Sequence, residues 1–450
     1  MTKKIQRLHP CAKLPLALAV AASMSTPVSA FQFYMGDVEA SVDTTLSAGA
    51  SWRMEEQSPF LVGQGNGGEG GAINSDDGNL NFDKHDTYSK IVKGNTDFLI
   101  QSGDYGAFVR AKYWYDFELK DEGRATDSVG QTRQLSSAGD KNASGGEILD
   151  AYIWADYWLG EMPLNVRLGK QVVSWGESTF IFNGISVINP VDLGAIRAPG
   201  AEIKEALLPV NMLYGSLGLT ENLTVEAFVQ LQYEKTRIDD CGTFFSTTDY
   251  VADDCGPVYG QSSLSEDQNR LGLGGVNPFA IPRLADNEPD DTDQFGVALR
   301  WYVPELNDTE FGFYFIQYHS RFPLISGFTA TDPDNSGDIS LPAEAFDPVT
   351  GAKYFVEYPE RIKLFGLSFN TTTPNGISIG GEYSFKQDVP LQINSPDLLT
   401  AAIGNIYSPV FQDRVPDLND NGFADLSDAT ASGFLGTAQS GYDLYDVSQL

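Results

Sequence analysis

The sequence predicts an all-β protein, specifically a transmembrane antiparallel β-barrel. Apolar and polar residues alternate with a period of two in about twelve segments, and the connections between these segments are alternately short and long. A period of two places one kind of side chain on each face of a strand. No run of about 18 apolar residues follows the first thirty residues, so a membrane protein with this sequence must cross with strands.

The first thirty residues are typical of a secretory signal peptide. A basic region precedes an apolar core at 14–24, and the small residues at 28–30 form a cleavage site. We therefore divide the chain into a signal peptide, 1–30, and an outer-membrane barrel, 31–450. The basic residues of the signal are Lys3, Lys4, Arg7 and Lys13.

The alternation is longest in the first mature segment, where Val38, Leu46 and Trp52 share one face and Asp43 and Ser51 share the other. The expected strands are 38–53, 92–101, 107–118, 147–159, 164–173, 210–219, 223–233, 293–303, 310–320, 354–370, 377–386 and 441–450. The last segment reads as a strand that is only beginning. We therefore expect a truncated sequence, whose complete barrel has about 14 to 16 strands.

Short and long connections fall on opposite sides of the expected sheet. Bacterial outer-membrane barrels have short periplasmic turns and long outside loops. The alternative is a water-soluble β-sandwich, but aromatic residues gather at the strand ends, as membrane-interface belts do. These residues are Tyr113, Trp114, Tyr115, Trp154, Tyr157, Trp158, Trp301, Tyr302, Tyr314 and Tyr318.

Charge and cysteine content limit the partners. Removal of the signal leaves 61 acidic against 25 basic residues, a formal net charge of −36. Nucleic acid is therefore not an expected partner, because phosphate binding needs a basic surface. Acidic outside loops suit a layer rich in divalent cations. In an exported chain, the remaining cysteines, Cys241 and Cys255, are expected to form a disulfide.

The stretch 169–210 is rich in both apolar and charged residues, and it contains prolines that the middle of a strand cannot accept. Asn189 as N-cap and Pro190 as first residue predict a short helix over 190–196, and a second helix is expected over 201–208. The stretch is the third long loop. Folded inward, 174–209 would narrow the lumen; folded outward, it would be an external lid.

If the segment folds inward, two groups of residues are expected to face the lumen. The constriction or gate residues are Lys170, Trp175, Glu177, Asn189, Asp192, Arg197, Glu202 and Lys204. The lumen-lining residues are Arg110, Lys112, Trp114 and Asp116.

The sequence contains few motifs that are typical of catalytic sites. Gly376 to Gly380 has the spelling of a nucleophile elbow but lies in an alternating strand. His319 and Ser320 are neighbours on a strand and point to opposite faces. We therefore expect no enzymatic activity.

An acidic stretch has the spacing of a calcium loop, with oxygen side chains at Asp417, Asn419, Asn421, Asp425 and Asp428 and glycine at the sixth position. A terminal Asp stands where Glu is usual. The stretch from Asp332 begins similarly but has Ala343 at the twelfth position. Calcium is the one candidate cofactor.

Several strings resemble the proteobacterial outer-membrane domain-of-unknown-function family 1302. They are Asp43-Thr44-Thr45-Leu46, Gly49-Ala50-Ser51-Trp52-Arg53, Lys112-Tyr113-Trp114-Tyr115-Asp116, Leu168-Gly169-Lys170-Gln171-Val172-Val173-Ser174-Trp175-Gly176-Glu177-Ser178 and Val187-Ile188-Asn189-Pro190-Val191-Asp192. The resemblance implies a barrel in the outer membrane of a Gram-negative bacterium, typically longer than this chain. It also implies a periplasmic lipoprotein-carrier-like partner and an efflux-type permease for lipid-like molecules. It supplies no catalytic or binding residues.

The leading hypothesis is therefore an outer-membrane channel for small hydrophobic or amphipathic compounds, surrounded by outer-membrane lipid and gated by 169–210. Two alternatives remain. One is a structural or adhesion barrel whose acidic loops bind calcium, and the other is a general porin for polar solutes.

Overall fold

The fold is one large antiparallel sheet, seen in a computed structural model that describes residues 24–27, 31–124, 135–177, 183–271, 280–328, 352–402 and 438–439. The sheet has thirteen strands, in the order β1-β3-β4-β5-β6-β7-β8-β9-β12-β13-β16-β17, and β2 also pairs with β3. Its strands are β1 Met24–Pro27, β2 Phe31–Met35, β3 Val38–Trp52, β4 Thr87–Ser102, β5 Tyr105–Asp116, β6 Ser144–Leu159, β7 Met162–Gln171, β8 Val210–Thr220, β9 Leu223–Gln230, β12 Phe295–Val303, β13 Thr309–Tyr318, β16 Ile362–Thr372 and β17 Ser378–Gln387.

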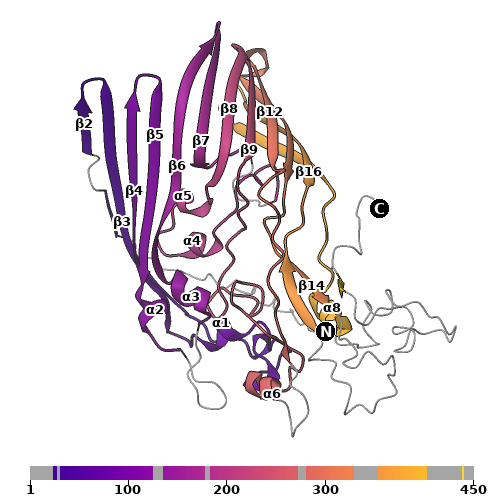
Figure 1. Ribbon diagram of the computed structural model, residues 1–450. Helices are drawn as coiled ribbons and strands as arrows, with labels where there is room; N and C mark the ends of the chain where they lie inside the picture. Colours follow the sequence, from indigo (N-terminus) through magenta and orange to yellow (C-terminus); the bar gives the residue numbers. More distant parts are fainter. Residues whose placement is uncertain are drawn as a thin grey trace, which may run out of the picture.

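The all-β antiparallel class is confirmed, and so is the pattern of short connections. Tight hairpins join β4 to β5, β6 to β7 and β8 to β9. The 3₁₀ turn η3, Pro304–Leu306, lies between β12 and β13. Figure 1 shows these turns at one end of a curved sheet and most of the long connections at the other. Alternation and turn residues are local signals, which is why the sequence located these hairpins.

The expected closed barrel is not formed by the described strands. The sheet is open, with β1 and β2 at one edge and β17 at the other. Figure 1 shows the strands curving around a space without meeting across it. The expected strand 441–450 lies outside the described residues.

The expected strand 354–370 is wrong, because the chain breaks there into two strands. β15, Lys353–Glu357, pairs with β14, Leu324–Phe328, in a small sheet that also holds β18, Ala438–Gln439. Pro359 has no N–H for a ladder, and Arg361 has a φ of 59°. The chain therefore leaves one sheet at this point and enters the other at β16.

The exposed face of the large sheet is apolar, whereas its buried face carries polar groups on β3, β4 and β5 and mainly apolar groups from β8 to β16. In β3, Ser47 and Ser51 are 9% and 8% exposed, whereas Leu46 and Trp52 are 41% and 45% exposed. The polar side chains of this strand therefore face the concave side, and the apolar ones face outward. Other apolar residues exposed on the same face include Leu168, Leu213, Val229, Val297, Phe313, Phe365, Leu367 and Phe369.

The aromatic residues expected at strand ends divide between the two faces. Tyr113, Tyr115, Tyr157, Trp158, Trp301 and Tyr302 are exposed, in keeping with interface belts. Tyr314 and Tyr318 are buried instead. They face the concave side, where another part of the chain covers them.

Short helices occupy the long connections. They are α1 Asp77–Leu80, α2 Phe117–Asp121, α3 Ser137–Asn142, α4 Leu193–Arg197, α5 Ile203–Ala206, α6 Glu266–Leu271 and α8 Ser395–Ala402. Figure 1 shows α4 and α5 in the space that the curved sheet surrounds. In the described part of the chain, no helix has the length and apolar character needed to cross a membrane.

The long connection 231–294 contains the small two-stranded sheet of β10, Val258–Tyr259, and β11, Ala280–Ile281. The expected disulfide between Cys241 and Cys255 is confirmed within this connection.

Candidate functional site

The third long connection folds back onto the concave face of the sheet. We call its described parts, 172–177 and 183–209, the cover segment. Val173, Trp175, Ile185, Val187 and Ile188 from this segment are buried in one apolar cluster. The cluster also contains strand residues from β8, β9, β12, β13 and β16, namely Val210, Met212, Tyr214, Phe228, Ala298, Tyr314, Ile316, Tyr318, Ile362 and Leu364. The apolar content that made 169–210 unusual as a loop is therefore used in packing.

Trp175 anchors the start of the cover segment. Its side chain is 1% exposed and packs on Phe228 and Tyr314, with ring centroids 5.1 and 5.8 Å away. The indole N–H donates to the Glu226 carboxylate at 2.7 Å, and Arg300 donates to the other oxygen of Glu226 at 2.7 Å. A large apolar ring with a satisfied N–H fixes this end of the segment on the sheet.

A second anchor joins the cover segment to the edge strand β17. The Glu382 carboxylate accepts the backbone N–H of Glu177 at 2.9 Å and that of Ile185 at 3.3 Å. A Cβ at Gly184 would lie 2.3 Å from the same carboxylate, so a larger residue there would displace the Glu382 side chain from this position. The Glu177 side chain accepts from Asn370 of β16 at 2.9 Å. Glu177 therefore contacts β16 and β17, whereas the strand that precedes it in the chain is β7.

Asn189 closes the base of the cover segment rather than capping a helix. Its amide oxygen accepts from the Val173 N–H at 2.9 Å, and its amide nitrogen donates to the carbonyls of Gln171 and Leu208. The expected helix over 190–196 begins later, at Leu193, with Asp192 as its N-cap. Val191 pairs with Leu207 in an isolated bridge, so the chain is extended where the helix was expected.

The second helix is shorter than expected, because α5 has only the four residues Ile203–Ala206. Glu202 and Lys204 form an ion pair with each other at 2.8 Å. Glu205, which was not among the expected gate residues, is buried against β4. It accepts from Lys93 at 2.6 Å and from Asn95 at 2.5 Å, and both Lys93 and Glu205 have 1% exposed side chains.

The middle of the cover segment meets the long connection after β9. Arg237 donates to Glu147 at 2.8 Å and lies 3.6 Å from Asp192. Arg197 pairs with Asp239 and lies over the ring of Phe245 at 5.2 Å. The cover segment is therefore held between the sheet and a further layer of chain.

Arg321 joins this layer to the sheet. It is buried and donates to the carbonyls of Ile188 and Glu234 and to the side chain of Gln230. Burial lowers the pKa of its guanidinium to about 10. Nearby, burial raises the pKa of the Asp240 carboxyl to about 6, although Asn142 donates to it.

Lys170 lies apart from the other expected gate residues. It stands at the end of β7, and its ammonium donates to the Ile148 carbonyl at 3.0 Å. Leu168, two residues earlier on the same strand, is exposed on the apolar face, whereas Gln171 is buried. A period of two therefore places Lys170 on the outer face, where it does not contact the cover segment.

The residues expected on the lumen side of β5 have different surroundings. Arg110 pairs with Asp97 at 2.7 Å and with Asp150 at 3.1 Å. Trp114 donates its indole N–H to the Asn142 carbonyl at 2.7 Å. Lys112 is 8% exposed, and its ammonium lies 5.0 Å from the Trp114 ring.

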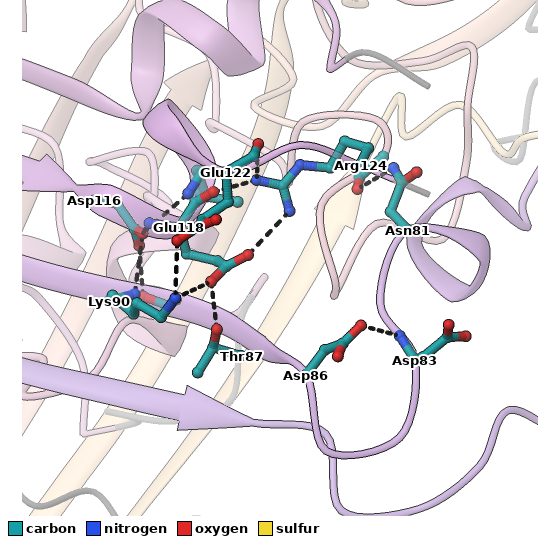
Figure 2. Close-up of polar contacts among 12 residues, drawn as sticks. Asn81, Asp83, Asp86, Thr87, Lys90, Asp116, Glu118, Glu122 and Arg124 are labelled. Atoms are coloured by element: carbon teal, nitrogen blue, oxygen red, sulfur yellow. Dashed lines mark hydrogen bonds and ion pairs between the residues drawn. The ribbon is translucent and has the colours of Figure 1, made fainter. Parts of the chain in front are cut away.

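Asp116 is used in a polar network at the ends of β4 and β5. Its carboxylate accepts the backbone N–H of Lys90 and of Glu118, as well as the Ser89 hydroxyl. Figure 2 shows this network, in which Glu118 also joins Lys90 to Arg124. Asp116 therefore caps α2 and holds two strands together, which the sequence did not indicate.

A cavity of about 650 Å³ lies between β4, β5 and β6, the cover segment and the connection after β9. Among the expected site residues, Lys112, Trp114, Asp116, Asp192 and Arg197 line it. The others do not: Lys170, Trp175, Glu177, Asn189, Glu202, Lys204 and Arg110 lie elsewhere on the sheet or in the cover segment. The cavity has the size of a pocket for a small organic molecule.

Carboxylates gather at one further place. One oxygen each from Asp76, Asp77 and Asp249 lies within 4.8 Å of the other two, a set of donors that suits a hard cation such as calcium. The expected calcium loop, Asp417 to Asp428, lies outside the described residues. The strand 377–386 is confirmed as β17, Ser378–Gln387, but Gly376 and Ile377 of the nucleophile-elbow spelling lie in the turn before it.

Comparisons with known proteins give one result. No curated protein and no solved structure matches the chain with significance. A family model described as "Protein of unknown function (DUF1302)" matches residues 12–450, nearly the whole chain, and the protein therefore belongs to this family.

Proposed function

We propose that this protein is a channel rather than an enzyme, and that it carries small hydrophobic or amphipathic compounds across the outer membrane. The observation that carries the proposal is the packing of the cover segment on the concave face of a sheet whose other face is apolar and exposed. An apolar outer face suits lipid contact. A non-strand segment inside the curve is tolerated where protein or water surrounds it.

The cover segment acts as the gate in this proposal. Trp175 and Ile185 are packed in the apolar cluster, whereas Glu177 is held by hydrogen bonds to Glu382 and Asn370. The end at Glu177, which is held to β16 and β17 by hydrogen bonds, is the part that opens in this proposal. A periplasmic lipoprotein-carrier-like protein and an efflux-type permease are the proposed partners, as the family resemblance implies.

Conductance in planar lipid bilayers tests the gate. Deletion of 177–208 is expected to raise single-channel conductance severalfold, because it removes the material that covers the concave face. Glu382→Ala is expected to raise the open probability without changing the full conductance, because it removes two anchoring hydrogen bonds. Glu305→Ala, in the exposed turn η3, is the matched control.

An unchanged conductance in the deletion variant would contradict the gate. Absence of any pore in the wild type and in both variants would contradict transport and favour a structural barrel. Equal permeation of sugars and of apolar solutes would favour a general porin.

A further inference from the structure

The cavity beside β5 contains a buried lysine without an acidic partner. No carboxylate of the described residues lies within 4.0 Å of the Lys112 ammonium. The ammonium lies over the Trp114 ring in a cation–π contact. The Lys112 side chain lines the cavity of about 650 Å³. An ammonium group taken out of water is costly unless a charge or hydrogen-bond partner compensates.

The residues that could neutralise Lys112 are used elsewhere. Its cross-strand partner on β6 is Glu147, whose two oxygens accept from Arg237 at 2.8 and 3.1 Å. Its partner on β4 is Asn95, which donates to Glu205. The Glu147 and Glu205 carboxylates are thus already paired with Arg237 and Lys93, and neither is an ion-pair partner of Lys112.

Part of the cavity wall is apolar and aromatic. Ile91, Leu119 and the stacked rings of Tyr88 and Phe244 line the same cavity, with the ring centroids 4.0 Å apart. The Phe245 ring packs edge-on against the Tyr88 ring, with the ring centroids 5.5 Å apart. The cavity thus joins a lysine that has no ion-pair partner among the described residues to an apolar surface, within a volume that suits a small organic ligand.

We propose that this cavity binds an amphipathic anion, with a carboxylate or similar anionic group on Lys112 and an apolar body against the aromatic wall. The inference rests on the proposed transport function, since it names the chemical class of compound that the channel takes. The cavity is bounded by Asp192, Arg197 and Glu205 of the cover segment. A bound anion therefore lies directly beside the gate.

Isothermal titration of the full chain in detergent tests this assignment with three probes: 2-naphthoate, neutral 2-naphthol, and acetate, which lacks an apolar body. We expect 2-naphthoate to bind and to be weakened about tenfold by Lys112→Met, which removes one charge-assisted contact. Binding of 2-naphthol is expected to be unchanged by that substitution. Acetate at the same concentration is expected not to compete.

The controls separate charge from folding. Lys112→Arg keeps the charge and is expected to bind 2-naphthoate within about threefold of the wild type. Lys84→Met removes a lysine that pairs with Glu56 and does not line the cavity. This variant is expected to bind 2-naphthoate as the wild type does. Equal binding of 2-naphthoate by the wild type and by Lys112→Met would overturn the proposal, as would equal affinity for 2-naphthoate and 2-naphthol.

Binding in detergent does not depend on conductance. A protein that conducts but does not prefer the anion would refute the anion site alone. A protein that binds the anion but forms no pore would refute the channel alone.

Discussion

At the scale of single residues, burial decides what the charged groups of the cover segment and its neighbours do. Asp240 faces the cavity, and it is half-buried beside Asn142. Its folded-state pKa of about 6 exceeds the ordinary value of a carboxyl group. The folded protein therefore binds a proton that the unfolded chain releases, and stability is lost as the pH rises from about 4 to 6.

Asp240→Asn removes this cost while keeping an acceptor for Asn142. We expect the variant to be more stable than the wild type at pH 8 by roughly 1 to 2 kcal/mol, a figure reduced for partial solvent screening, and to be equally stable at pH 4. Thermal unfolding followed by intrinsic fluorescence at both pH values measures this difference. Asp37→Asn, in the exposed turn after β2, is the control. A stability difference that does not vary with pH would refute the assignment.

At the scale of elements, the attachment of α5 to β4 depends on the buried pair of Lys93 and Glu205. Neither residue was expected in the site. The sequence places Lys93 on the polar face of an alternating strand and Glu205 in a short helix, but 112 residues separate them. Local periodicity contains no information on which strand a distant helix meets.

Breaking this pair on one side leaves the other charge buried. Lys93→Met and Glu205→Gln are each expected to lower the free energy of unfolding by about 3 to 5 kcal/mol. The double variant is expected to lose less than either single variant, because no buried charge remains. Denaturant unfolding of the four proteins measures the coupling. Additive losses would show that the two side chains act independently.

At the scale of the whole molecule, the large sheet presents an apolar face outward. Leu367 and Phe369 of β16 are exposed, whereas Ser368 between them is buried. If lipid covers the exposed face, an arginine there must enter hydrocarbon.

Leu367→Arg is therefore expected to lower insertion into lipid bilayers, at a cost of about 2 to 4 kcal/mol near the bilayer midplane. Leu61→Arg, at an exposed leucine in the 3₁₀ turn of the connection after β3, is the matched control and is expected to insert normally. Insertion is measured as the fraction folded into vesicles. Equal insertion of the two variants would show that the apolar face meets something other than lipid.

The sequence by itself determined most of the strand segments, the hairpins between them and the disulfide. Alternation and turn residues are local signals, and only one pair of cysteines remains after the signal peptide. It also marked 169–210 as the segment to examine. It placed the first helix too early, since Asn189 could serve as an N-cap on local grounds but bonds instead to Gln171, Val173 and Leu208. It joined β15 to β16 because alternation continues on either side of the break at Pro359 and Arg361.

Only the tertiary structure decided which residues each charged side chain contacts. Glu177 lies 205 residues from Glu382, and the contact between them exists because the sheet curves and brings β17 to the cover segment. The same curvature brings Lys93 to Glu205 and Arg237 to Glu147, so that neither carboxylate pairs with Lys112. Pairing between distant residues depends on the whole packing arrangement, and no local pattern in the chain specifies it.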